Sequence, residues 1–293
     1  MANRPEAEID VSENLVRALL HEQAPGFEDQ PLALVDRGWD NTNWRLGNGH
    51  MIRVPHRAVA APLIELEQQW LPDIADRLDI AVPAPLIHGH PSEVAGFPWP
   101  WSVVPWIEGH DAERALSIDE ARSAERLGTF FAQLHTPAVP EAPTNPYRGG
   151  PLADRRRPFE ERLGRLGARI DGPAARRIFD EGARAPAATD RLWLHGDLHA
   201  RNMIVSEGLL AGVVDWGDLC AGDRATDLAG AFMLVPGQLD LVASRANADD
   251  AAWERARGWA IHFAITYLAM SDDEPKQRRV GGNLLGALGV GCD

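Results

Sequence analysis

Two polar motifs, each bordered by apolar runs, constrain this chain more than any other part of it. The stretch His195–Asn202 (HGDLHARN) follows the apolar run Leu192–Leu194, and Asp215-Trp216 closes a second apolar run that begins at Leu209. Short apolar runs of this kind are typical of buried strands, and Ser206-Glu207-Gly208 predicts a tight turn before the second run. The sequence therefore predicts a buried β-hairpin with a polar loop at its entrance and an acid at its exit.

This arrangement brings three polar side chains toward one point. Asp197 and Asn202 lie on the loop that enters the hairpin, and Asp215 lies where the hairpin ends. A phosphoryl-transfer site needs one carboxylate near the attacking hydroxyl, together with an amide and a second carboxylate that hold magnesium against the phosphates. The spacing thus favours a phosphotransferase.

The two motifs together resemble those of the aminoglycoside phosphotransferase family, whose fold is similar to that of the protein kinases. The resemblance implies that Asp197 is the catalytic acid–base and that Asn202 and Asp215 bind Mg2+. It also implies ATP or GTP as the phosphoryl donor, and a support role for an acid at Asp227, at the start of a buried helix. It covers essentially the whole chain, is strongest from Leu192 to Ala229, and is only positional elsewhere.

The resemblance implies a protein-kinase-like α+β fold with two lobes. Residues 1–104 would form an N-terminal nucleotide-binding lobe with an antiparallel sheet and one key helix. Residues 105–293 would form a mainly helical C-terminal lobe that carries the catalytic hairpin and binds the substrate.

Other interpretations of the motif remain open at this stage. The spacing His195-x-Asp197-x-His199 also resembles the metal-ligand cluster of some hydrolases. Such a site needs further ligands downstream, where only His262 is available, inside an apolar helix. Asp197 and Asp215 could also be ordinary capping or turn residues, and the chain could be a binding protein that has kept the fold without catalysis.

In the N-terminal lobe, the strand Leu32–Val35 precedes a turn-rich loop at Gly38–Asn43. Kinase-like folds cover the nucleotide phosphates with a loop in this place. The loop has one glycine, so Asn41 and Thr42 are predicted to supply hydrogen-bond donors for the phosphates.

The resemblance places a phosphate-binding cation at Arg53, on the strand that follows. Arginine stands where kinases have lysine, and its planar fork is not interchangeable with an ammonium group. The partner of Arg53 is expected to be Glu67 on a helix from Ala60 to Leu78, with Glu65 as the alternative. The predicted apolar face of this helix consists of Leu63, Leu66, Trp70, Ile74 and Leu78.

The segment from Val103 to Ile107 is predicted to connect the lobes and to contact the nucleotide base through its backbone, which assigns Val104 and Trp106 to the donor site. In the C-terminal lobe, Ser117 and Glu120 have the spacing of a capping box, so they predict the start of a helix. The segment Thr136–Pro158 is rich in proline and glycine and reads as an ordered excursion or a mobile insert. The charges of the arginine-rich helices that follow are expected to face solvent.

The composition of the chain limits the classes of partner that it is expected to bind. The chain has 293 residues, 45% hydrophobic and 25% charged, with only two cysteines and a net charge of −14. The acidic balance argues against nucleic acid as a partner. It favours a cationic acceptor, attracted by the acids Asp218, Asp223, Asp227, Asp272, Asp273 and Glu274. No run approaches the ~18 apolar residues of a membrane span, no signal peptide begins the chain, and a cytoplasmic protein is expected.

The expected function is therefore O-phosphorylation of a small hydroxylated molecule, an aminoglycoside-like or other antibiotic. The alternative acceptor is a small primary metabolite, such as an amino-alcohol or a sugar.

Overall fold

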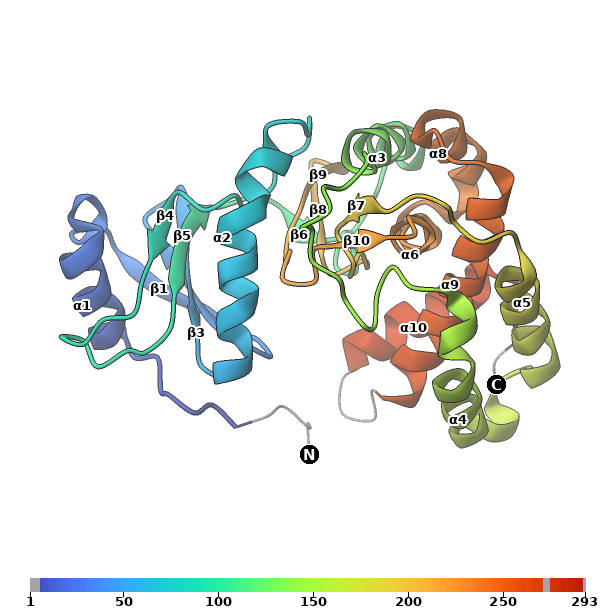
Figure 1. The fold of residues 1–293 in the computed structure, drawn as a ribbon, viewed down its shortest axis with the longest axis horizontal. Coiled ribbons are helices and arrows are strands. Elements are labelled where there is room, and N and C mark those ends of the chain that lie inside the picture. Colours follow the sequence, from blue (N-terminus) through green and yellow to red (C-terminus); the bar gives the residue numbers. More distant parts are fainter. Residues whose placement is uncertain (1–5, 271–274, 292–293) are drawn as a thin grey trace. The chain divides into compact units, whose positions relative to one another are not determined.

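The computed structural model of the chain describes residues 6–270 and 275–291. Backbone contacts divide the chain into two compact units, an N-terminal unit that ends at Glu108 and a C-terminal unit that begins at Gly109. Both units appear in Figure 1, where the colours follow the sequence from blue to red. Helices and antiparallel strands together make this an α+β fold.

The N-terminal unit is built on a sheet of five antiparallel strands in the order β1-β2-β3-β5-β4. Its main elements are α1 (Glu13–Gln23), β1 (Leu32–Arg37), β2 (Asn41–Leu46), β3 (His50–Pro55), α2 (Ala61–Ala75), β4 (Ile87–Gly89) and β5 (Trp101–Pro105). Short 3-10 helices occupy Pro25–Phe27 and Ala58–Ala60.

The sheet lies between α1 and α2 (Figure 1). Alternate strand residues point to opposite faces, so Ile52 and Val54 of β3 join the core with Leu19 and Leu20 of α1. Arg53, between them in sequence, points to the other face and reaches α2. The period of two in β3 therefore separates an apolar face from the face that holds the predicted phosphate-binding cation.

Two details of this unit correct the sequence-based expectations. Asn41 and Thr42 belong to β2, so only Gly38 to Asp40 remain as the turn before that strand. The buried face of α2 consists of Ile64, Glu67, Leu71 and Ile74. It is thus one position away from the predicted stripe, and the carboxylate of Glu67 lies on the buried face itself because Arg53 neutralises it there.

The C-terminal unit is mainly helical. Its longer helices are α3 (Glu120–Leu134), α4 (Arg156–Leu166), α5 (Gly172–Arg184), α8 (Leu239–Ala246), α9 (Asp250–Ala269) and α10 (Pro275–Ala287). Short helices are α6 (Ala225–Leu228), α7 (Ala231–Leu234) and 3-10 turns at Leu152–Arg155, Gly167–Arg169 and Pro236–Gln238. The strands are β6 (His110–Asp111), β7 (Leu192–Leu194), β8 (Met203–Ser206), β9 (Leu209–Val213) and β10 (Cys220–Gly222).

The helix α9 forms the centre of this unit. It is buried along most of its length, as expected for a helix that is apolar on nearly every side. It packs against α5, α10, α4 and α6, while α3 packs against α8. None of the described helices is both long enough and apolar enough to span a bilayer.

The start of α3 also differs from the prediction. Asp119 is the N-cap and accepts a hydrogen bond from the backbone N–H of Arg122 at 3.0 Å. The helix therefore begins two residues later than the capping box at Ser117 predicts. The backbone N–H of Asp119 donates to the carbonyl of Gly208 in the hairpin loop at 2.8 Å, which holds Asp119 in place at the start of the helix.

The predicted hairpin is present. Strands β8 and β9 pair antiparallel with Ser206 opposite Leu209, so Glu207 and Gly208 form a two-residue loop. Both loop residues have positive φ, 50° and 77°, the combination that matches the twist of the flanking strands in a tight hairpin. The hairpin fixes the positions of the chain immediately before β8 and after β9, which carry the candidate site.

Candidate active site in the C-terminal unit

The candidate catalytic loop leaves β7 through a sharp turn at Gly196. This residue has φ of 88°, a left-handed conformation that glycine adopts without steric cost. A Cβ atom here would lie 2.3 Å from the backbone oxygen of Asp218. Glycine is therefore required both by the backbone conformation and by the close approach of the two segments.

A buried carboxylate holds this loop in place. Asp227, at the start of α6, accepts hydrogen bonds from the backbone N–H groups of His195 at 2.7 Å and Gly196 at 2.9 Å. His135 lies 3.3 Å from the same carboxylate, and burial lowers the pKa of His135 despite the opposing charge of Asp227. Asp227 thus has the support role that the resemblance implied.

Both ring nitrogens of His195 are hydrogen-bonded to backbone groups of the loop and the hairpin. Its Nε2 donates to the carbonyl of Val214 at 3.0 Å, and its Nδ1 accepts from the backbone N–H of Asp197 at 3.2 Å. A histidine whose two ring nitrogens are both used in this way has no nitrogen left for a metal. Among the described residues, no group of three His, Cys, Asp or Glu is arranged to hold a metal ion, so His195, Asp197 and His199 do not form the cluster that their spacing resembles.

Hydrogen bonds of the hairpin connect the segments that carry the two predicted metal ligands, Asn202 and Asp215. Asn202 donates its side-chain N–H to the Asp197 carbonyl at 3.0 Å, and its own carbonyl accepts from the backbone N–H of Val214 at 2.8 Å. The next residue, Asp215, is exposed and has φ of 65°. Such a left-handed conformation is uncommon outside glycine and is tolerated by aspartate.

Trp216 anchors this turn. Its side chain is fully buried, its Nε1 donates to the carbonyl of Val213 at 3.0 Å, and its ring packs edge-on against His195 with centroids 4.7 Å apart. The tryptophan therefore couples the exit of the hairpin to the loop at its entrance, which keeps Asp215 and Asn202 on the same side of the hairpin.

The donor set fits a magnesium ion. Magnesium is held by a few hard oxygen ligands from the protein, with phosphates and waters completing its shell. The amide nitrogen of Asn202 is used by the Asp197 carbonyl, so its oxygen is the atom left to bind a cation, and Asp215 presents an exposed carboxylate.

Asp197 itself is half-buried and engaged on both oxygens. Arg148 donates to one oxygen at 2.6 Å, and the ring of His199 lies 3.5 Å from the other. Burial alone would raise the pKa of Asp197, but the charges of Arg148, His199 and His195 bring it down to about 2. The carboxylate is therefore ionised at any physiological pH.

Arg148 is the site residue that sequence reasoning missed. It comes from the segment 136–158, which carried no motif, and no local pattern connects it with Asp197. Burial opposes its charge, but Asp197 and Asp218 raise its pKa above the ordinary value. The proline- and glycine-rich composition of the segment was the only signal, and it pointed to an irregular path rather than to a partner.

Backbone hydrogen bonds fix the Arg148 segment. The carbonyl of Gly149 accepts from Asp223 at 2.8 Å, and the carbonyl of Pro143 accepts from Ala221 at 2.8 Å. A Cβ atom on Gly222 would lie 2.4 Å from the Gly149 oxygen, so the two chains can approach this closely only at glycine. The segment is an ordered excursion, and it places Arg148 on Asp197.

The predicted donor-site residues lie in the N-terminal unit. Arg53 and Glu67 form a buried ion pair; Arg53 is 5% exposed and Glu67 fully buried. Glu65 is exposed and takes no part in this pair. The choice between the two glutamates therefore falls on Glu67, which α2 turns toward the sheet.

Asn41 and Thr42 lie on β2. Thr42 is 1% exposed, and its hydroxyl is hydrogen-bonded to the ring of His56 at 3.1 Å. Asn41 is half-buried, and its backbone carbonyl accepts from Gly38 at 2.8 Å. Of the two, Asn41 has the side chain that is more open to a ligand.

Val104 and Trp106 follow one another at the end of β5. Val104 is buried opposite Met51 of β3. The backbone N–H of Trp106 donates to the carbonyl of Gly49 at 2.8 Å, so this donor is already used within the unit. The guanidinium of Arg45 stacks on the Trp106 ring, 3.9 Å from its centroid.

Three of the six acids expected to attract a cationic acceptor have partners within the C-terminal unit. Asp218 accepts from the side chain of Asn145 at 2.6 Å, and Asp223 forms a buried ion pair with Arg255 at 2.6 Å. Asp227 holds the catalytic loop, as described above. The remaining three, Asp272, Asp273 and Glu274, lie outside the described residues.

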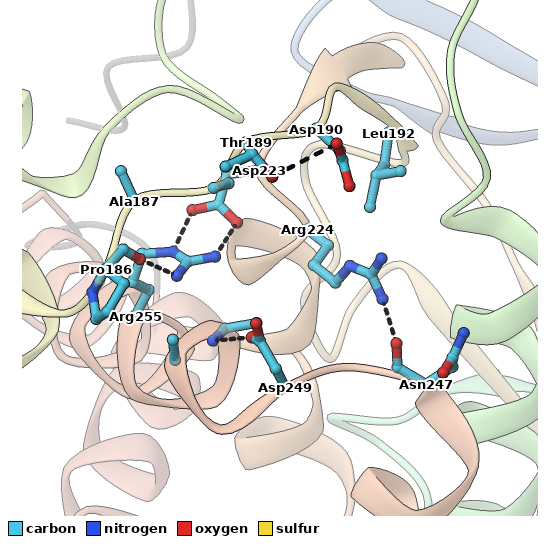
Figure 2. A pocket seen from close by; sticks show the side chains of 13 residues that line it. Pro186, Ala187, Thr189, Asp190, Leu192, Asp223, Arg224, Asn247, Asp249 and Arg255 are labelled. Atoms are coloured by element: carbon cyan, nitrogen blue, oxygen red, sulfur yellow. Dashed lines mark hydrogen bonds and ion pairs between the residues drawn. The ribbon is translucent and has the colours of Figure 1, made fainter.

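Figure 2 shows the Asp223–Arg255 pair at the wall of a cavity of about 280 Å3. Arg224 lines the same cavity and donates to the backbone carbonyl of Asn247 at 2.7 Å. None of the residues predicted for catalysis, donor binding or metal binding lines it. This cavity is thus separate from the predicted site residues.

Comparisons with known proteins agree with this geometry. The sequence profile described as the phosphotransferase enzyme family matches residues 32–259. A search of curated proteins found no match. Similar solved structures include the GDP complex of wild-type aminoglycoside 2'-phosphotransferase-IIIa, at 15% identity, with 95% of this chain and 99% of that chain covered and a TM-score of 0.66.

Two further similar structures are a macrolide 2'-phosphotransferase type I and a streptomycin–ATP–APH(2")-IIa ternary complex. The first is 19% identical, with 96% of this chain and 99% of that chain covered and a TM-score of 0.61. The second is 16% identical, with 95% and 97% covered and a TM-score of 0.60. At these identities the likeness concerns the fold, which is kinase-like.

Proposed function

The chain belongs to the phosphotransferase enzyme family, and from that premise we propose that it moves the γ-phosphoryl group of ATP or GTP to a hydroxyl of a small molecule, with Asp197, Asn202 and Asp215 as its catalytic set. Its class is that of a small-molecule phosphotransferase with a hydroxyl acceptor. The observation that carries the assignment of residues is the loop His195–Asn202, which Asp227 holds so that Asp197 and Asn202 share a hydrogen bond.

In this proposal Asp197 orients the acceptor hydroxyl and accepts its proton. A carboxylate with a pKa of about 2 is a weak base, so its main contribution is to accept the hydroxyl's hydrogen bond and to hold the oxygen in line with the phosphorus. Positioning and electrostatic stabilisation supply most of the rate in phosphoryl transfer, and no covalent enzyme intermediate is needed.

The oxygen of Asn202 and the carboxylate of Asp215 would hold Mg2+. A Mg2+ ion held there would supply positive charge to neutralise the charge that develops on the donor phosphates. Asp215 is presented for this role by its left-handed backbone and by the buried ring of Trp216 after it.

Donor binding is assigned to the N-terminal unit. Arg53, held by Glu67, would contact the nucleotide phosphates, with Asn41 and Thr42 beside them on β2. Val104 and Trp106 would contact the base. Support comes from the buried Arg53–Glu67 pair, because the planar fork of a guanidinium matches the oxygens of a phosphate.

The acceptor proposed first is an aminoglycoside-like or other antibiotic, because solved structures with this fold include aminoglycoside and macrolide phosphotransferases. The net charge of −14 supports an amine-bearing acceptor. The second candidate, a small primary metabolite, is favoured by the arginine side chains near Asp197, which are considered in the next subsection.

The test is the variant Asp197→Asn, which keeps the shape of the side chain but removes its negative charge. We expect the turnover number for phosphoryl transfer to fall by about 10²–10⁴-fold, while binding of the Mg-nucleotide, measured by calorimetric titration, stays within about twofold. Aminoglycosides, macrolides, sugars and amino-alcohols, each with ATP and GTP, form the acceptor panel. Turnover close to that of the unaltered enzyme would rule out Asp197 as the catalytic group.

A further inference from the structure

Arginine side chains gather on one face of α9 in the C-terminal unit. Arg148 lies over the ring of Phe263, with its guanidinium carbon 5.5 Å from the ring centroid. Arg162 of α4 donates to the hydroxyl of Thr266 at 3.1 Å. Residues 263 and 266 are three apart, so they share a face of the helix, and both guanidinium groups lie on that face.

A third arginine belongs to the same cluster. Arg155 donates to the carbonyl of Pro146 at 3.0 Å, in the segment that presents Arg148. All three arginines act on His262, on the same face of α9: its pKa is lowered to about 3, first by burial and then by the positive charges of Arg162, Arg148 and Arg155. We call Arg148, Arg155 and Arg162 the arginine cluster.

These charges repel one another. Burial lowers the pKa of Arg162, and the charges of Arg165, Arg148 and Arg155 lower it further. Each member of the arginine cluster is half-buried rather than fully solvated. Holding like charges together in a partly desolvated place costs free energy unless an opposite charge balances them.

Two members of the cluster have no such balancing charge in the part of the chain that the structure describes. Arg155 and Arg162 form no ion pair with any carboxylate of the described residues, although the chain has 43 acidic and 29 basic residues. Exposed arginines on α4 and on α5 behave differently. Arg157 pairs with Glu161 at 2.8 Å, and Arg176 pairs with Glu160 at 2.9 Å.

A buried polar atom lies beside the cluster as well. His262 is 4% exposed, and its Nδ1 has no hydrogen-bond partner among the described residues. The Nε of Arg148 is likewise buried without an acceptor there. Buried donors and acceptors in proteins are nearly always satisfied. We therefore expect the arginine cluster to bind a group rich in hydrogen-bond acceptors that does not come from the described residues.

Arg148 connects the arginine cluster with the proposed catalytic carboxylate. Its Nη2 lies 2.6 Å from the Asp197 carboxylate, the group proposed to hold the acceptor hydroxyl. Tyr267, next to Thr266 on α9, contacts the ring of His199 with centroids 6.0 Å apart. The arginine cluster therefore borders the place where the acceptor's reactive hydroxyl would sit.

We propose that the arginine cluster is an anion-binding subsite for the acceptor, so the enzyme phosphorylates a hydroxyl on a molecule that also carries a carboxylate or phosphate group. The inference rests on the proposed function, since it assumes that Asp197 receives the acceptor hydroxyl. Guanidinium groups suit it because their planar forks match the oxygens of carboxylate and phosphate. Arg155 and Arg162 would bind the anion, and Arg148 would lie between it and Asp197.

The activity test uses acceptors in matched pairs: sugar phosphates against the free sugars, and hydroxy acids against their amides. Aminoglycosides are the cationic comparison. The anionic member of a pair should be the better substrate by about tenfold or more in kcat/KM, the size expected of a charge-assisted hydrogen bond. The sugar pairs test recognition of a phosphate group, and the hydroxy-acid pairs test recognition of a carboxylate group.

The variants Arg155→Gln and Arg162→Gln should each raise KM for the anionic acceptor by about tenfold or more. KM for the nucleotide and the rate with a neutral acceptor should change by less than about twofold. Arg157→Gln is the matched control, because Arg157 lies on the same helix, faces solvent and already pairs with an acid. If one of the cluster variants folds poorly, the other still gives the comparison.

A binding test does not depend on activity. Inorganic phosphate at matched ionic strength should raise the melting temperature of the unaltered protein and of Arg157→Gln more than that of either cluster variant. Phosphate bound at the nucleotide site would stabilise all four proteins equally, and that result would overturn the subsite.

The two proposals fail separately. Efficient transfer to a neutral or cationic acceptor, unaffected by the cluster variants, would overturn the subsite but leave the phosphotransferase function intact. Absence of transfer to any acceptor would count against the function, while the phosphate-dependent shift would still decide whether the arginine cluster binds an anion.

Discussion

The charged groups around Asp197 determine the pKa of its carboxylate and so the state in which it can act. Burial would raise its pKa, but the nearby charges of Arg148 and His199 keep it at about 2. Asp218, which follows the hairpin, has a pKa that is raised by burial and by the charge of Asp197. The pKa values of these two carboxyl groups are thus shifted in opposite directions, and the low pKa of Asp197 suits it to accept a hydrogen bond from a hydroxyl.

Asp215 provides a residue-scale prediction. The variant Asp215→Ala should weaken nucleotide binding in the presence of Mg2+ by about tenfold or more, because a cation ligand is lost, and should reduce turnover as well. Binding measured without Mg2+ should be nearly unchanged. Calorimetric titrations of both proteins, with and without the metal, test this. An identical Mg2+ dependence would remove Asp215 from the ligand set.

His262 makes stability depend on pH. Its pKa in the folded protein is about 3, below the ordinary value of about 6.5, so the unfolded chain binds an extra proton between these values. Stability is therefore complete above pH 6.5 and falls as the pH drops toward 3, by up to about 1.4 kcal/mol per pH unit from this group alone.

The variant His262→Phe should flatten this dependence. The free energy of unfolding, measured in denaturant between pH 7 and pH 4, should fall less steeply in the variant than in the unaltered protein. Parallel curves for His262→Phe and the unaltered protein would contradict the assignment.

At the scale of elements, local patterns predicted the catalytic-loop hairpin better than they predicted helix boundaries. The β8–β9 hairpin and its turn were correct because strand period and turn chemistry act over a few residues. The predictions for the start of α3 and for the buried face of α2 were wrong because both features depend on residues far away in the chain. Asp119 is positioned by Gly208 of the hairpin loop, and Glu67 is buried because Arg53 of β3 balances its charge.

The turn that begins the catalytic loop gives an element-scale prediction. Gly196→Ala would force a side chain into a left-handed position and to within 2.3 Å of the Asp218 backbone oxygen. We expect a loss of about 1–3 kcal/mol in stability, together with loss of transfer activity.

Gly164 is the matched control for that experiment. It lies in the interior of α4, and a Cβ atom there would meet nothing within 4 Å. Gly164→Ala should therefore stabilise the protein by about 0.5–1 kcal/mol without changing activity. Chemical denaturation and initial-rate assays of the two variants make the comparison, and equal effects would contradict it.

At the scale of the molecule, the chain has two compact units. The N-terminal unit has its own core, in which Leu46 is fully buried, and the C-terminal unit is organised around α9, in which Ile261 is fully buried. Calorimetry should therefore resolve two component transitions rather than one.

Core truncation should separate these transitions. Leu46→Ala should destabilise one component and Ile261→Ala the other, each by about 2–5 kcal/mol. Scanning calorimetry of both variants and of the unaltered protein is the measurement. A single transition that moves equally in both variants would mean that the two units unfold as one.

The sequence by itself indicated the reaction class, because the motifs that carry Asp197, Asn202 and Asp215 resemble those of a phosphotransferase family and lie on one loop and one hairpin that local periodicity predicts. It left open which glutamate meets Arg53, and it gave no sign of Arg148. Only the tertiary structure decided these, because each is a contact between segments far apart in the chain. Arg148 reaches Asp197 because two glycines, Gly149 and Gly222, let separate segments approach at backbone distance, and no pattern confined to neighbouring residues records that approach.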